Sequence, residues 1–154
     1  MPPAHPFDFD AVRDTGAAIR LIGDGDVAGV IHTTDPAETG IDIYIGSGGA
    51  PEGVLAAAAL RCIGGQMQGR LQLNTDDKVA RAARMGIADP GKVYRMDEMA
   101  RGDVLFAATG VTDGNLLAGV KFGRDSIQTH TIVMRSSSQT VREIKARHQD
   151  MDKF

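Results

Sequence analysis

The stretch that decides the fold runs over residues 41–63 and reads IDIYIGSGGAPEGVLAAAALRCI. Apolar residues alternate over 41–45, which predicts a β-strand, and the alanine-rich run 54–63 predicts a helix. A glycine-rich loop, residues 46–53, lies between them. A strand, a glycine loop and a helix in this order are typical of an α/β domain whose ligands bind beyond the strand ends.

Strand and helix patterns alternate along the rest of the chain, which we predict to be a single α/β domain over residues 1–154. Further strands are predicted at 18–22, 66–73, 92–94, 103–109, 120–122 and 129–136. Further helices are predicted at 8–17, 27–31, 75–85 and 139–149. This alternation favours a layered domain with a mixed, largely parallel sheet flanked by helices, and the last strand pair predicts an antiparallel edge.

Composition excludes several classes of protein. The chain has 154 residues with one cysteine, so no internal disulfide can form and a reducing, cytoplasmic location is expected. The 20 acidic residues outnumber the 17 basic ones, which gives no support for a nucleic-acid partner. No apolar run approaches the roughly 20 residues of a membrane helix, and no signal peptide is recognisable at the start. An enzyme or a ligand-binding domain remains.

The glycine loop before the alanine-rich helix is the most specific feature of the sequence. Glycines and a helix N-terminus together form a good anion site. The loop matches neither GxxxxGK[ST] nor GxGxxG, so a nucleotide is not indicated. Glu52 adds a negative charge where a phosphate would bind. It is either a ligand of a divalent cation that bridges to the phosphate, or a carboxylate that complements the helix dipole; the residues leave both open.

Two further loops follow predicted strands, and we expect all three to converge. Asp24 and Asp26 could bind sugar hydroxyls or a metal; alternatively, Asp24 is a turn residue and Asp26 a helix N-cap. Asp113, in the third loop, is interpreted as a turn residue. Cys62 is predicted to be buried in its helix. The four histidines show no ligand spacing and are expected on the surface or in loops: His5, His32, His130 and His148. No residue is predicted to be catalytic.

Four segments, in this order and spacing, resemble the class II fructose-1,6-bisphosphatases over nearly the whole chain. They are RLIGDGDVAG at 20–29, GGAPEGVLAAAALRCIGG at 48–65, AATGVTDG at 107–114 and VMRS at 133–136. The resemblance implies the C-terminal domain fold of the sugar-phosphatase superfamily. It also implies hydrolysis of the 1-phosphate of fructose 1,6-bisphosphate, or of sedoheptulose 1,7-bisphosphate, with Mn²⁺ or Mg²⁺ as cofactor. Under this resemblance Glu52 is a metal ligand, and the substrate contacts are Asp24, Gly25, Asp26 and Gly49.

The sequence departs from that family in two respects. Members are about twice as long, and this chain resembles their C-terminal half, without the N-terminal half that carries most metal ligands. Family members also have a Pro-Arg-His segment ahead of the first helix, where this chain has Pro3-Ala4-His5 and thus lacks the basic residue. We therefore expect the chain alone to lack turnover and to need a separate N-terminal half or a second copy. The alternative is a non-catalytic sugar-phosphate-binding module. An exposed apolar patch would favour the half-enzyme, and a covered surface would favour the module.

Overall fold

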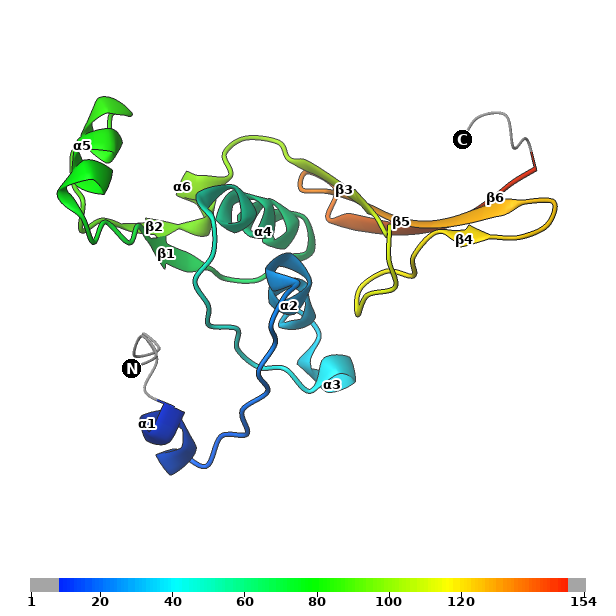
Figure 1. Ribbon diagram of the computed structural model, residues 1–154, viewed down its shortest axis with the longest axis horizontal. Coiled ribbons are helices and arrows are strands. Elements are labelled where there is room, and N and C mark those ends of the chain that lie inside the picture. The colour runs from blue at the N-terminus through cyan, green and yellow to red at the C-terminus, as the bar shows by residue number, and fades with distance from the viewer. Residues whose placement is uncertain (1–8, 150–154) are drawn as a thin grey trace.

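The computed structural model in Figure 1 describes residues 9–149, in which helices and strands are both present. The helices are α1 (Phe9–Asp14), α2 (Asp26–His32), α3 (Pro36–Thr39), α4 (Ala50–Ile63), α5 (Asp76–Arg84) and α6 (Met96–Met99). The strands are β1 (Gln68–Arg70), β2 (Val93–Arg95), β3 (Leu105–Thr109), β4 (Lys121–Phe122), β5 (Ile127–Arg135) and β6 (Thr140–His148). The α/β class is therefore confirmed.

The strands form two sheets, and every pairing between described strands is antiparallel. β1 pairs with β2, with Gly69 opposite Tyr94. In the larger sheet β5 is central, with β6 along one edge and with β3 and β4 along the other. The antiparallel pairing predicted for the last strands is confirmed for β4 and β5. The prediction of a largely parallel sheet is not, because no described strand pair is parallel.

Two predicted strands do not form in the structure. Residues 17–22 and 41–49 have neither helical nor strand structure. Apolar residues predominate over 17–22 and alternate over 41–45, yet Leu21 and Ile43 are 70% and 72% exposed. A β-strand forms only when its backbone N–H and C=O groups hydrogen-bond to a neighbouring strand. Alternation of apolar residues specifies which face of the strand is buried, but it does not specify that neighbouring strand. These segments have the residue composition of strands, but no neighbouring strand pairs with them among the described residues.

The predicted helix at 139–149 is wrong, because this segment is strand β6. It pairs with β5 along its whole length, from Thr140 opposite Arg135 to His148 opposite Ile127. The turn between the two strands places Gln139 at a φ of 45°, in the left-handed region. Basic residues at 142, 145 and 147 look like a charged helix face, but the long antiparallel ladder outweighs that local preference.

The core lies on both sides of α4. On one side, Ala59 and Cys62 pack with Ile31 of α2 and with Phe106, Ile132 and Met134 of the larger sheet. On the other side, Val30, Ala56 and Leu60 form a smaller cluster against Tyr44, Met67 and Met96. Cys62 is buried as predicted, and its burial raises the pKa of the thiol.

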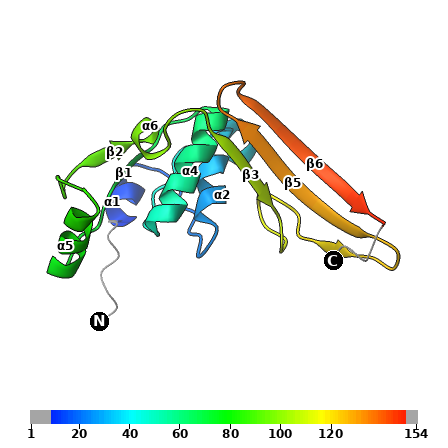
Figure 2. The same cartoon turned by 90° about the horizontal axis from the view of Figure 1, so that it is seen from above.

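Figure 2 shows the β5–β6 hairpin as a long arm that extends away from α2 and α4. Only the Arg135 end of β5 lies beside the helices, where Met134 is fully buried. Within the described part of the chain, no helix is long and apolar enough to cross a membrane.

Asp103 fastens the beginning of β3 to the end of β5. Its Oδ2 accepts hydrogen bonds from Arg135 at 2.6 and 3.2 Å, and its Oδ1 accepts from Ser136 Oγ at 3.1 Å. The Arg135 guanidinium, followed by the serine contacts, lowers the pKa of Asp103 from 3.8 to about 2. A carboxyl group with a lowered folded-state pKa stabilises the fold above its ordinary pKa, and this stabilisation is lost as the pH falls.

We expect Asp103→Asn to lower the free energy of unfolding at neutral pH. The difference from the wild-type chain should be full above about pH 4 and should shrink as the pH falls toward 2. Urea denaturation at a series of pH values measures this difference. Asp97→Asn is the matched control, because Asp97 makes only a 3.6 Å exposed ion pair with Arg95. A difference that stays constant from pH 6 to about pH 2 would contradict the assignment.

Candidate functional site

The loop at residues 23–26 leads into α2 through a left-handed turn at glycine. Gly25 has a φ of 84°, a conformation that glycine adopts without strain. Asp24 Oδ1 accepts a hydrogen bond from the Gly25 N–H at 2.7 Å, which supports its interpretation as a turn residue. Gly25 is the N-cap and Asp26 is the first residue of α2. The alternative that Asp26 is the N-cap is therefore wrong, and its carboxylate is left for another partner.

That partner is Tyr44, whose hydroxyl donates to Asp26 Oδ1 at 2.8 Å. The bond joins the turn before α2 to the segment 41–49. Burial, followed by the hydrogen bond and the charge of Asp26, raises the pKa of Tyr44 from 10.0 to about 12. Tyr44 thus stays a neutral donor at physiological pH. The sequence analysis missed this residue, because alternation alone cannot distinguish a tyrosine that packs from one that positions a carboxylate.

The glycine loop meets the same carboxylate. A Cβ added at Gly48 would lie 2.7 Å from Asp26 Oδ2, closer than side chains normally approach. Residue 48 must therefore be glycine for Asp26 to keep its position. The predicted convergence is confirmed for these two loops, which lie 22 residues apart in sequence (48 against 26).

Gly49 and Glu52 form the first turn of α4. Gly49 is the N-cap in an extended conformation, and a proline follows within the first two helical positions. The Glu52 carboxylate folds back over Gly49, so that a Cβ there would collide with Oε2. Glu52 is exposed and lies at the positive end of the helix dipole. The geometry suits both interpretations of this residue, since an exposed carboxylate can also accept a cation.

The third loop is held by its own return segment. Asp113 Oδ1 accepts from the Gly119 N–H at 2.9 Å, and the Gly114 N–H donates to the Leu117 carbonyl at 3.0 Å. A Cβ at Gly110 would collide with the Ala118 carbonyl oxygen. Asp113 is therefore a turn residue, as the sequence suggested.

The amino-acid sequence of the chain matches a known protein family. Residues 3–148 match the family of bacterial fructose-1,6-bisphosphatases, glpX-encoded. The chain belongs to this family. The match includes all of Asp24, Gly25, Asp26, Gly49 and Glu52.

Curated relatives carry the name D-fructose 1,6-bisphosphatase class 2/sedoheptulose 1,7-bisphosphatase. The protein of Crocosphaera subtropica is 40% identical over 166 aligned positions, which cover 99% of this chain and 48% of that protein. Those of Trichodesmium erythraeum and Synechococcus elongatus are 40% identical over 159 positions, covering 95% of this chain and 46% of each protein. The chain spans about half the length of the curated relatives it matches.

The acidic side chains of residues 9–149 are not grouped into a complete metal centre. Among residues 9–149, no group of three or more His, Cys, Asp or Glu side chains could hold a metal ion. Mg²⁺ and similar hard cations take about six oxygen ligands. Glu52 offers an exposed carboxylate of the right chemistry, but the described residues alone do not fit a Mn²⁺ or Mg²⁺ site.

One histidine departs from the expected surface position. His130 lies in β5 and is largely buried, with a side chain 13% exposed. His32 ends α2, and His148 Nε2 lies 3.1 Å from Thr129 Oγ1. No local pattern around His130 predicts this burial, because the register of β5 against its neighbours places the ring. His5, with the Pro3-Ala4-His5 segment, lies outside the described residues.

We expect Asp26→Asn to lower the pKa of Tyr44 from about 12 toward its ordinary value of 10.0, because the negative charge is removed. The chain has two tyrosines and no tryptophan, so a Tyr94→Phe background leaves Tyr44 as the only chromophore of its kind. Titration of the near-ultraviolet tyrosinate absorbance measures the shift. Asp24→Asn in the same background is the control and should leave the titration unchanged. Equal effects of the two variants would contradict the Asp26–Tyr44 contact.

Proposed function

We propose that this chain acts as the C-terminal half of a class 2 fructose-1,6-bisphosphatase. In this role it supplies the residues that bind the sugar phosphate and one metal ligand. It becomes catalytically active when the N-terminal half of the enzyme is present. The contact of Gly48 with Asp26 carries the proposal, because it brings the two loops into one site at the start of α4. The single free cysteine supports a reducing compartment, the cytosol, for this activity.

The chain's own residues would bind and orient the substrate. The Asp24 and Asp26 carboxylates have acceptor capacity beyond the bonds described above, and sugar hydroxyls are matching donors. Tyr44 holds Asp26 in place. Gly48 and Gly49 leave room for the Asp26 and Glu52 carboxylates beside the backbone. A phosphate would bind near them at the N-terminus of α4, where the helix dipole favours an anion.

Glu52 would supply one carboxylate ligand to Mn²⁺ or Mg²⁺, and the other ligands would come from the remaining half. A divalent cation held by Glu52 and those other ligands would polarise a phosphoryl group and lower the pKa of a bound water. Without those other ligands, Glu52 remains a carboxylate at a helix start. This is the physical reason to expect no turnover from the chain by itself.

The surface beside the candidate site supports a half-enzyme. Large apolar side chains are exposed on the unpaired segments and on the first turns of α4: Leu21, Ile22, Ile43, Ile45, Val54 and Leu55. A cavity of about 370 Å³ separates residues 42–46 from residues 66–68. The accessible surface is 11,274 Å², whereas a compact 16.3 kDa protein exposes about 7,500 Å². An independent sugar-phosphate-binding module would cover such a surface.

The test is phosphate release from fructose 1,6-bisphosphate with Mn²⁺, by the chain alone and after mixing with a separately produced N-terminal half of a relative. We expect no turnover alone and turnover on mixing. Turnover by the monomeric chain would contradict the need for metal ligands from a second polypeptide. Inactivity in both samples, with sugar phosphate still bound, would favour the non-catalytic module, and activity that follows self-association would favour a second copy as the partner.

In the active mixture, Glu52→Gln should lower phosphate release about 100-fold or more, since even groups that only orient metal ligands cost 10–100-fold. The amide keeps the size of the side chain but removes the charge that attracts the cation. Glu38→Gln, an exposed acid of α3, is the matched control and should leave the rate unchanged. A rate that survives Glu52→Gln would make Glu52 a helix-dipole residue only.

A further inference from the structure

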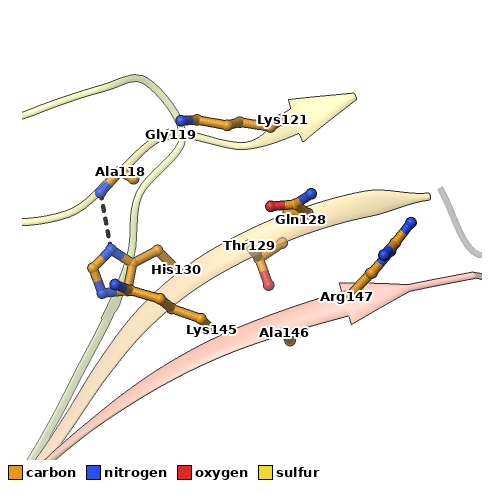
Figure 3. Close-up of a pocket in the computed structure, with 9 residues that line it drawn as sticks. All are labelled: Ala118, Gly119, Lys121, Gln128, Thr129, His130, Lys145, Ala146 and Arg147. Atoms are coloured by element: carbon orange, nitrogen blue, oxygen red, sulfur yellow. Dashed lines mark hydrogen bonds between the residues drawn. The ribbon is translucent and has the colours of Figure 1, made fainter. Parts of the chain in front are cut away.

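A second polar site lies on the arm, away from α2 and α4. It is a cavity of about 430 Å³ over the free halves of β5 and β6, drawn in Figure 3. Three of its lining side chains are basic and none is acidic: the lining consists of Ala118, Gly119, Lys121, Gln128, Thr129, His130, Lys145, Ala146 and Arg147. In a chain with a net charge of −3, this local excess of positive charge is unexpected.

The strand register places the basic side chains on one face of the sheet. Gln128 is opposite Lys121 on one side and opposite Arg147 on the other, and His130 is opposite Lys145. Directly paired residues of an antiparallel sheet project to the same face. We call this set the basic face. It continues the face on which Ile132 and Met134 pack against α4, but at residues 128 and 130 of β5 that face is polar.

The spacing suits a phosphate group. Neighbouring strands lie about 4.8 Å apart, and alternate residues of one strand about 7 Å apart. Lys121, Gln128 and Arg147 therefore lie side by side across three neighbouring strands, with Lys145 one step along β6. Arg147 is oriented by a hydrogen bond from its Nε to Ser126 Oγ at 3.1 Å. Ammonium and guanidinium donors make strong charge-assisted hydrogen bonds to phosphate oxygens.

His130 adds a fixed donor at the same place. Its Nδ1 accepts from the Ala118 N–H at 3.1 Å, which puts the proton of the neutral ring on Nε2. That Nε2 is buried without a hydrogen-bond partner among the described residues. Oε2 of the exposed Glu143 lies 3.7 Å from it, an ion-pair distance when the ring is protonated but longer than a hydrogen bond. Figure 3 shows the Lys145 side chain reaching toward this ring.

We infer that the basic face binds a phosphate-bearing small molecule at a second site, separate from the loops at Asp26 and Gly48. The cavity volume lies in the range of small-ligand pockets, about 300–1,000 Å³. The lining has no aromatic side chain on which a nucleobase could stack, so a single-stranded nucleic acid is not the ligand that this surface fits. The inference does not depend on the proposed bisphosphatase activity, because it uses none of that site's residues.

The test is titration of the isotope-labelled full chain with inorganic phosphate, followed by amide NMR at constant ionic strength. We expect saturable shifts around His130 and Lys145. Lys145→Gln and Arg147→Gln should each weaken binding about tenfold, the value of a hydrogen bond to a charged group. Arg142→Gln is the matched control, because it removes the same charge from the opposite face of β6 and should change affinity less than about twofold.

Equal weakening by all three variants would overturn the inference, as would shifts confined to residues 23–26 and 48–53 or no saturable shift. The spectra report whether each variant is folded; if Lys145→Gln is not, Lys121→Gln on β4 decides in its place. Parallel titrations with fructose 1,6-bisphosphate and with fructose distinguish the source of the phosphate. Tighter binding of the bisphosphate than of inorganic phosphate would identify a sugar phosphate, and binding of neutral fructose on this face would contradict an anion site.

Discussion

The close packing of α4 against its neighbours is the constraint on which the rest of the structure depends. Ala57 and Ala59 are completely buried, and side chains this small let α2 and the larger sheet approach the helix axis. At the other end of α4, the Arg61 guanidinium donates to the Ala100 and Gly102 carbonyls at 3.2 and 2.9 Å. The helix is thereby fixed to the chain on both sides, and its first turn is held at a defined place.

The position of the candidate site is determined by helix α4. The glycine loop ends at the N-cap of α4, and α2 packs beside α4, so the two loop ends meet without a sheet to align them. The Tyr44 hydroxyl and the absent side chain of Gly48 then fix the Asp26 carboxylate. The site is built by two helix starts and the hydroxyl of the partly buried Tyr44. What lies open is the apolar flank formed by the unpaired segments, where a further polypeptide could pack.

The proposed sites use opposite features of the same fold. The site proposed for a sugar phosphate and a cation, at the start of α4, consists of carboxylates that lie close to glycines. On the arm, three basic side chains and the largely buried imidazole of His130 lie on a face that no described helix covers. Strand β5 is common to both regions. Its Ile132 and Met134 pack against α4, and its His130, on the same face, lines the second cavity.

The sequence by itself determined the α/β class, the central helix, the glycine loop and the residue types of the candidate site. These are local properties: an alanine run, a Gly-Pro helix start and Asp-Gly turns act over a few residues. The tertiary structure alone decided the strand partners. It left 17–22 and 41–49 unpaired, made 140–148 a strand, and placed Tyr44 on Asp26 and His130 beneath Lys145. Pairing and burial depend on residues distant in sequence, and no local pattern encodes which distant neighbour a strand will meet.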